Sequence, residues 1–134
     1  MARRFIIVLI MVAVTGCTWS SLAGWSVTSG TVKGDVERGR EIFTHGINGS
    51  PPCLSCHGLT GGAFSLGPIM SGVAGRAAGR VPELAADDYL RQSILHPAAF
   101  IVPGYRDIMY ARYADHFGDQ EIADLVAFLH SLEP

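Results

Sequence analysis

The sequence predicts one small all-α domain behind an N-terminal leader, and three observations support this. Segments 35–43 and 119–132 carry apolar residues at helical spacing, and no segment shows a strong strand pattern. Between them, a C-x-x-C-H motif at 53–57 is followed by a Gly-rich stretch, 58–79, without regular periodicity. So long a stretch is unusual in a compact domain unless it wraps around a rigid group. The 134 residues are enough for one domain and not for two.

The first helix is predicted to begin after Asp35, whose carboxylate can cap the main chain, and to run through Phe43. Val36, Gly39 and Phe43 fall on one face of it. A glycine inside a helix costs about 1 kcal/mol relative to alanine. Gly39 therefore indicates that another backbone approaches closely at this point. Glycines and prolines then break the chain before the C-x-x-C-H motif, at Gly46, Gly49, Pro51 and Pro52.

Two further helices are predicted in the second half of the chain. One covers about 88–95 and ends before Pro97, because the residue before a proline is disfavoured in a helix. The other covers about 119–132. Glu121 in its first turn and His130 near its end both agree with the helix dipole. Its apolar stripe consists of Ile122, Leu125, Val126 and Leu129.

The C-x-x-C-H motif is typical of covalent attachment of a c-type haem. Two thiols one helical turn apart can each add to a vinyl group of the same porphyrin, and the histidine that follows is the proximal axial ligand. A zinc site would need a second pair of Cys or His ligands at short spacing. A thioredoxin-like pair would lie in a βαβ pattern. Neither pattern is present, so we assign Cys53, Cys56 and His57 to one covalently bound haem c.

Residues 1–16 look like the signal peptide of a bacterial lipoprotein. Arg3-Arg4 precede an apolar run, 5–14, that is shorter than the roughly 20 residues that span a bilayer. The run ends in Val14-Thr15-Gly16-Cys17, which resembles the lipobox of lipoproteins, whose cysteine is lipidated. We expect Cys17 to anchor the exported protein in the periplasm or on the outer face of the cytoplasmic membrane. An uncleaved anchor and ordinary signal cleavage are the alternatives.

Residues 17–34 are rich in Ser, Thr and Gly, and predict a flexible tether between the lipid and a domain at 35–134. Trp19 and Trp25 depart from this composition. Each of them could contact the membrane, a partner protein or the domain. The formal net charge of −2 gives no indication of nucleic-acid binding. The expected partners are redox proteins, together with the membrane through the lipid on Cys17.

Residues 35–132 resemble the class I cytochromes c. In that family an N-terminal helix with a glycine and an aromatic residue crosses a C-terminal helix that has its own aromatic residue. Gly39 and Phe43 match the first helix, and Leu125 and Phe128 match the second. The resemblance implies three to four helices wrapped around one covalently attached haem.

The stretch from Gly67-Pro68 to 72–76 is similar to the proximal loop of this family. The resemblance implies that Pro68 packs on the haem and offers its carbonyl to the imidazole of His57. It also implies that Arg76 meets a haem propionate.

Met70 and Met109 are the candidates for the sixth ligand, because the other two methionines lie in the leader. Met70 lies in the loop assigned to the proximal side, whereas Met109 follows a helix and a turn, where the family places its axial methionine. We expect Met109 to bind the iron. The family usually has Pro after this methionine, and here Tyr110 follows. A core role for Met109 is an alternative, as are other histidines on the iron: His45, His96, His116 and His130.

These residues predict one-electron transfer through a single haem, by an electron carrier that is not itself an enzyme, since no catalytic constellation is visible. The stretch 93–125 is similar to oxidase-associated cytochromes c and to the mono-haem subunit of the quinol-oxidising alternative complex III. We therefore expect a membrane-anchored subunit of a respiratory or photosynthetic complex. The alternatives are a free lipid-tethered shuttle, and a haem-based sensor or small peroxidase with a labile sixth ligand.

Overall fold

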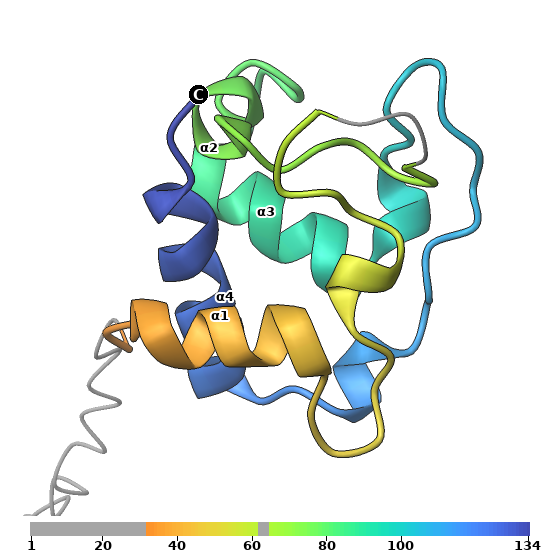
Figure 1. Ribbon diagram of the computed structural model, residues 1–134. Helices are drawn as coiled ribbons and strands as arrows, with labels where there is room; N and C mark the ends of the chain where they lie inside the picture. The colour runs from red at the N-terminus through yellow and green to blue at the C-terminus, as the bar shows by residue number, and fades with distance from the viewer. Residues whose placement is uncertain (1–31, 62–64) are drawn as a thin grey trace, which may run out of the picture.

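The computed structural model describes residues 32–61 and 65–134. This part of the chain holds four α-helices and no β-strand, which confirms the predicted all-α class. The helices are α1 (Val36–His45), α2 (Val73–Ala77), α3 (Ala86–Leu95) and α4 (Asp119–Ser131). Three single turns of 3₁₀-helix join them: η1 (Cys53–Ser55), η2 (Pro97–Ala99) and η3 (Tyr113–Asp115). Figure 1 shows α1 crossing α4, and α3 lying between this pair of helices and the long loops.

Helix α1 begins as the sequence predicts. The Asp35 carboxylate accepts a hydrogen bond of 3.0 Å from the main-chain N–H of Arg38. The helix continues to His45, two residues beyond the predicted Phe43, and ends at Gly46, whose φ of 72° lies in the left-handed region.

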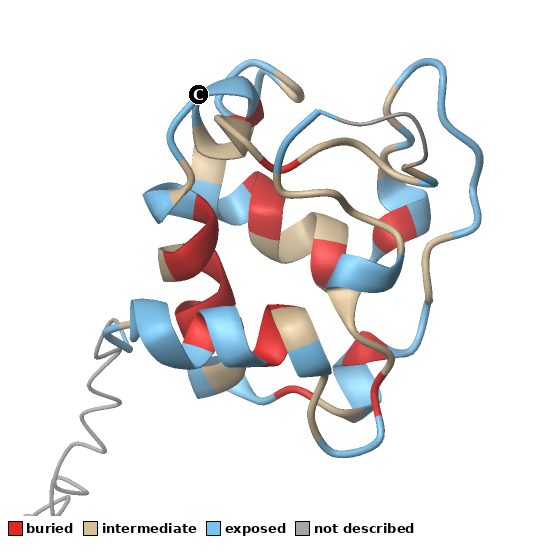
Figure 2. Cartoon of the chain, viewed as in Figure 1, coloured by how far each residue is buried: buried red, intermediate tan, exposed pale blue. Residues whose placement is uncertain are grey.

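The crossing of α1 and α4 explains the glycine inside α1. A Cβ atom on Gly39 would overlap the main-chain carbonyl of Asp124 and lie 2.8 Å from Cβ of Phe128. Next to it the rings of Phe43 and Phe128 pack with centroids 5.4 Å apart. The predicted close approach at Gly39 is therefore real, and α4 is the backbone that makes it. Figure 2 shows the buried residues on the facing sides of α1, α3 and α4; they include Ile42, Tyr89, Leu90, Ile122 and Leu125.

The chain already contacts α4 before α1 begins. The Gln120 amide donates to the Lys33 carbonyl, and a Cβ on Gly34 would overlap the carbonyl of Ala123. The last residues of the predicted tether, 17–34, thus pack on the domain. The predicted signal peptide (1–16), Cys17, Trp19 and Trp25 lie outside the described residues. Within the described part, no helix is both long enough and apolar enough to cross a membrane.

The stretch 58–79 differs from the prediction, because it contains α2. This helix has five residues, too few to show an apolar period, and it begins after Gly72, whose φ is 62°. Helix α3 begins two residues earlier than predicted and ends before Pro97 as predicted. Helix α4 matches its predicted span except for one residue at the C-terminal end.

Candidate functional site

A large apolar cavity lies between α3, α4 and the loops that follow η1 and η2. About 1140 Å³ inside it, the open mouth included, is not filled by protein atoms. Its apolar walls include Phe43, Leu90, Ile94, Phe100, Leu125 and Leu129. Because native interiors are close-packed, an apolar hollow in the middle of so small a domain indicates that a rigid group occupies it. We call it the central cavity.

The C-x-x-C-H motif forms one wall of the central cavity. It is wound into the turn η1, in which the N–H groups of Cys56 and His57 both donate to the carbonyl of Cys53, at 3.1 and 2.9 Å. This turn brings both thiols and the imidazole to the same wall. The two cysteines are free, so both sulfurs are available for other covalent bonds.

Cys53 is partly buried and packs against the apolar core. Burial raises its pKa to about 11, although a hydrogen bond with Tyr113 acts in the opposite direction. The same burial raises the pKa of Tyr113. A thiol of this kind is protonated at neutral pH, unlike the thiolate of a reactive redox pair. In the described residues, no three His, Cys, Asp or Glu side chains form a group that could hold a metal ion. These features do not favour the zinc and thioredoxin-like alternatives.

The imidazole of His57 is oriented by the loop that follows it. Its Nδ1 lies 2.9 Å from the Pro68 carbonyl oxygen, the contact that the resemblance implied. Since a carbonyl oxygen only accepts, Nδ1 carries the hydrogen and Nε2 keeps its lone pair for a metal. The ring packs against Gly67, where a Cβ would lie 2.7 Å from Nδ1. The contacts with Pro68 and Gly67 thus fix the tautomer of His57 and the orientation of its ring, and leave Nε2 as the nitrogen that could bind a metal.

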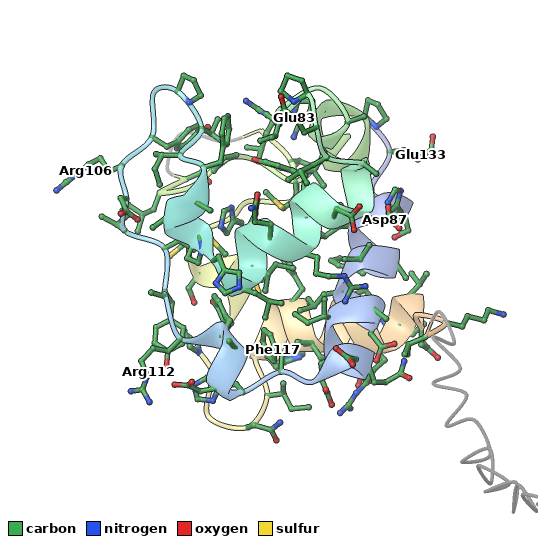
Figure 3. All side chains as sticks on the ribbon, turned by 180° about the vertical axis from the view of Figure 1, so that it is seen from behind. Glu83, Asp87, Arg106, Arg112, Phe117 and Glu133 are labelled. Carbon is green, nitrogen blue, oxygen red and sulfur yellow. The ribbon has the colours of Figure 1, made fainter. Side chains whose placement is uncertain are left out.

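Arg76 lies on the wall of the central cavity, but its guanidinium is bound to the protein. It donates to the main-chain carbonyls of Ser71 and Ile69, at 2.5 and 2.6 Å, and so supports the loop around Met70. Its predicted contact with a haem propionate stays a prediction. Arg80 and Arg106 also line the cavity, and no sequence motif points to either of them. Figure 3 shows the side chain of Arg106 pointing away from the protein.

Both candidate methionines line the central cavity, and they enter it from different segments. The N–H of Met70 donates to the Gly58 carbonyl at 2.8 Å, so Met70 is tied to the chain that follows His57. It is buried and belongs to the core. Met109 is partly buried and lies in the segment between η2 and η3. The two methionines thus reach the cavity from different parts of the chain, and Met109 as the iron ligand stays a prediction.

The other four histidines do not line the central cavity. His45, His96 and His130 are exposed, and His130 pairs with Asp87 at 2.6 Å. Both ring nitrogens of His116 have other hydrogen-bond partners, the Tyr110 hydroxyl and the main-chain oxygen of Asn48. His57 is the one histidine that contributes to this cavity, and the structure does not favour the alternative histidine ligands.

All six predicted cofactor residues line the central cavity: Cys53, Cys56, His57, Pro68, Arg76 and Met109. Two thiols and an oriented imidazole on one wall of an apolar cavity fit a planar group that is held by two thioethers and one axial nitrogen. The family model described as cytochrome c matches residues 36–133. The chain belongs to the cytochrome c family. The prediction of a c-type cytochrome is thereby confirmed, and the family implies a covalently attached haem c.

In this cytochrome, Cys53 and Cys56 would hold the haem and His57 would bind its iron. The haem supplies an iron centre that gains and loses one electron. The protein would contribute the nitrogen of His57, whose ring is oriented by Pro68, and an apolar cavity that would limit the access of water. The membership in this family indicates an electron carrier.

Proposed function

We propose that this cytochrome transfers single electrons through one haem c, with His57 and Met109 as axial ligands. The observation that carries this proposal is the composition of the central cavity. It contains the chain's one C-x-x-C-H motif, one histidine and two methionines, of which Met109 comes from a segment distant from the motif. A neutral thioether favours the reduced iron, so this ligand pair gives a comparatively high reduction potential.

Exposed apolar side chains at the mouth of the cavity support electron exchange with another protein. Leu66 is 60% exposed and Ile108 is 47% exposed, and both line the cavity. Ile101 and Tyr105 extend the same surface. Exposed apolar groups that gather in one place mark interaction sites more often than isolated ones do. A redox partner would thus contact the protein where the haem edge is nearest.

The ligand assignment is tested by spectroscopy on the haem-loaded protein. We expect Met109→Ala to remove the absorption of thioether-bound ferric iron and to lower the reduction potential. Met70→Leu is the matched control, because it changes the other methionine of the cavity with little change in volume. A ferric spectrum that changes in Met70→Leu and not in Met109→Ala would refute the assignment.

We further propose that the protein is a lipid-anchored subunit of a membrane electron-transfer complex, of the quinol-oxidising or oxidase-associated type. It would lie in the periplasm or on the outer face of the cytoplasmic membrane. The proposal is supported by the lipobox-like sequence ending in Cys17 and by the similarity of 93–125 to such subunits. A free lipid-tethered shuttle is the alternative.

A haem-stained native gel of detergent-solubilised membranes separates these two possibilities. Staining at the mass of a large complex supports the subunit, and the co-migrating proteins would identify its partners. Staining only at low mass, with the complexes intact, supports the shuttle. In a Cys17→Ala variant we expect the haem stain to leave the membrane fraction, and a variant that stays there would contradict the lipid anchor.

A ligand-binding function, as in a haem-based sensor or small peroxidase, is the second candidate. The observation in its favour is the weak main-chain support of the segment that carries Met109, since its hydrogen bonds are local in the described structure. Such a function requires Met109 to leave the iron readily. Rapid binding of carbon monoxide or cyanide at neutral pH would support this function. A haem that binds neither ligand would support electron transfer.

A further inference from the structure

The segment from residue 101 to residue 111, here called the Met109 segment, has few main-chain hydrogen bonds. Within the described part of the chain there are two, from Tyr105 to Val102 and from Ile108 to Arg106, both 3.0 Å long. Both stay inside the segment. Figure 1 shows it as a long loop that runs down one side of the molecule from η2 to η3. The position of Met109 must therefore depend on side-chain contacts.

The residue after Met109 provides such a contact. The Tyr110 hydroxyl lies 2.9 Å from Nε2 of His116, and Nδ1 of His116 lies 2.9 Å from the main-chain oxygen of Asn48. Because the Asn48 oxygen only accepts, Nδ1 carries the hydrogen. In the neutral imidazole, Nε2 then accepts from the Tyr110 O–H. The direction of each hydrogen bond is thus determined by the Asn48 carbonyl.

Asn48 is itself held in an unusual conformation. Its φ is 53°, the one positive φ of a non-glycine residue in the described structure. Its side-chain amide donates to the main-chain oxygen of His116 at 2.9 Å, so Asn48 and His116 are joined in both directions. Asparagine tolerates the left-handed region better than most residues, but such positions persist only where surrounding contacts hold them. The contacts with His116 therefore stabilise the conformation of the loop that leads into the C-x-x-C-H motif.

Aromatic packing fixes the ring of Tyr110. It meets Tyr113 edge to face, with centroids 5.0 Å apart, and Tyr113 stacks on Phe117 at 5.2 Å. The Tyr113 hydroxyl donates to the Pro51 carbonyl at 3.2 Å. Two residue pairs, His116–Asn48 and Tyr113–Pro51, thus connect the chain after Met109 with the loop before Cys53. The Tyr110–His116 bond ties the residue next to Met109 to the first of these pairs.

We propose that Tyr110 and His116 are positioning residues that keep the Met109 thioether on the iron. His116, anchored on Asn48, holds the Tyr110 hydroxyl, and this restricts the backbone next to Met109. The consequence is a sixth ligand that opens rarely, in a segment with little other support. This inference rests on the proposed axial role of Met109.

The test is cyanide binding to the haem-loaded ferric protein, because cyanide binds only when the sixth position opens. Tyr110→Phe removes the hydroxyl and keeps the ring. We expect its apparent cyanide affinity to rise by roughly twofold to tenfold, the effect of one lost hydrogen bond on the opening equilibrium. His116→Gln should give a similar rise. The apparent cyanide affinity of the double variant should be no higher than that of either single variant. Arg112→Ala is the matched control, because it removes an exposed ion pair with Asp115 two residues after Tyr110 and does not line the cavity.

Failure of this inference is distinguishable from failure of the proposed ligand. If Met109→Ala leaves the ferric spectrum unchanged, the axial role of Met109 is wrong and the positioning role falls with it. If Met109→Ala removes the thioether absorption but Tyr110→Phe binds cyanide like the wild type, only the positioning role is overturned. A lower resistance of Tyr110→Phe to urea with unchanged cyanide binding would show a purely structural role, and would overturn it as well.

Discussion

The main-chain N–H of Asp35 donates a hydrogen bond of 2.8 Å to Oδ1 of Asp124, across 89 residues of sequence. The same oxygen accepts from the side-chain amide of Gln120 at 2.7 Å. Asp124 is only 3% exposed and lies in the middle of α4. One buried carboxylate thus joins the start of α1 to α4, beside the place where Gly39 meets the same helix.

We expect Asp124→Ala to destabilise the haem-loaded protein by about 1–3 kcal/mol, because the Asp35 N–H loses its acceptor in a partly buried position. Urea unfolding followed by haem absorbance measures this. Asp119→Ala changes an exposed acid of the same helix and should cost less than about 1 kcal/mol. Equal costs for the two variants would show that the Asp35–Asp124 bond does not stabilise the fold.

Gly39→Ala should also destabilise the protein. Alanine would gain about 1 kcal/mol from helix propensity, but its methyl group would overlap the Asp124 carbonyl. We expect a net loss of about 1–3 kcal/mol, as for other overpacked sites. Gly75→Ala is the matched control, because nothing lies within 4 Å of its Cβ position in α2. A Gly39→Ala protein as stable as Gly75→Ala would mean that α1 and α4 can separate at no cost.

Gly67→Ala is expected to act on the iron ligand more than on the fold. The new methyl group would press on the His57 ring and disturb its bond to the Pro68 carbonyl. Contacts behind a ligating imidazole set its orientation and basicity. We therefore expect altered electron paramagnetic resonance of the ferric haem and a shifted reduction potential. Gly79→Ala, with open space at its Cβ position, should leave both unchanged; a Gly67→Ala protein with wild-type values would contradict this packing.

The elements that the sequence predicts best are those with a local signature. The motif at 53–57 specifies its chemistry in five residues, and α1 and α4 show their caps and apolar stripes. Even the close approach at Gly39 is predictable, because an uncompensated glycine in a helix calls for a backbone contact.

What the sequence does not predict depends on residues far apart in the chain. Asn48 and His116 are 68 residues apart, and no local pattern connects them. From the sequence alone, His116 is a lone histidine without a partner, and Tyr110 is only the residue that replaces the usual proline. Helix α2 is missed for another reason, since five residues are too few for a helical period. The contacts of Arg76 with the carbonyls of Ile69 and Ser71 are also absent from any sequence pattern, because they arise only in the folded loop.

The stability of the protein at alkaline pH should depend on Tyr113. Burial is the main cause that raises the pKa of its hydroxyl, and it persists when Cys53 is bound in a thioether. An unfolded tyrosine ionises near pH 10, whereas the folded one keeps its proton to higher pH. Unfolding therefore releases a proton above about pH 10. The contribution of Tyr113 to the free energy of unfolding is complete below that pH and declines above it, by at most about 1.4 kcal/mol per pH unit.

Tyr113→Phe should be less stable than the wild type at pH 7, because the bond to the Pro51 carbonyl is lost, and the difference in stability should shrink above pH 10. Urea unfolding of both proteins between pH 7 and 11.5, with exposed Tyr105→Phe as the control, measures this difference. A difference that is constant over this range would show that Tyr113 ionises equally in both states.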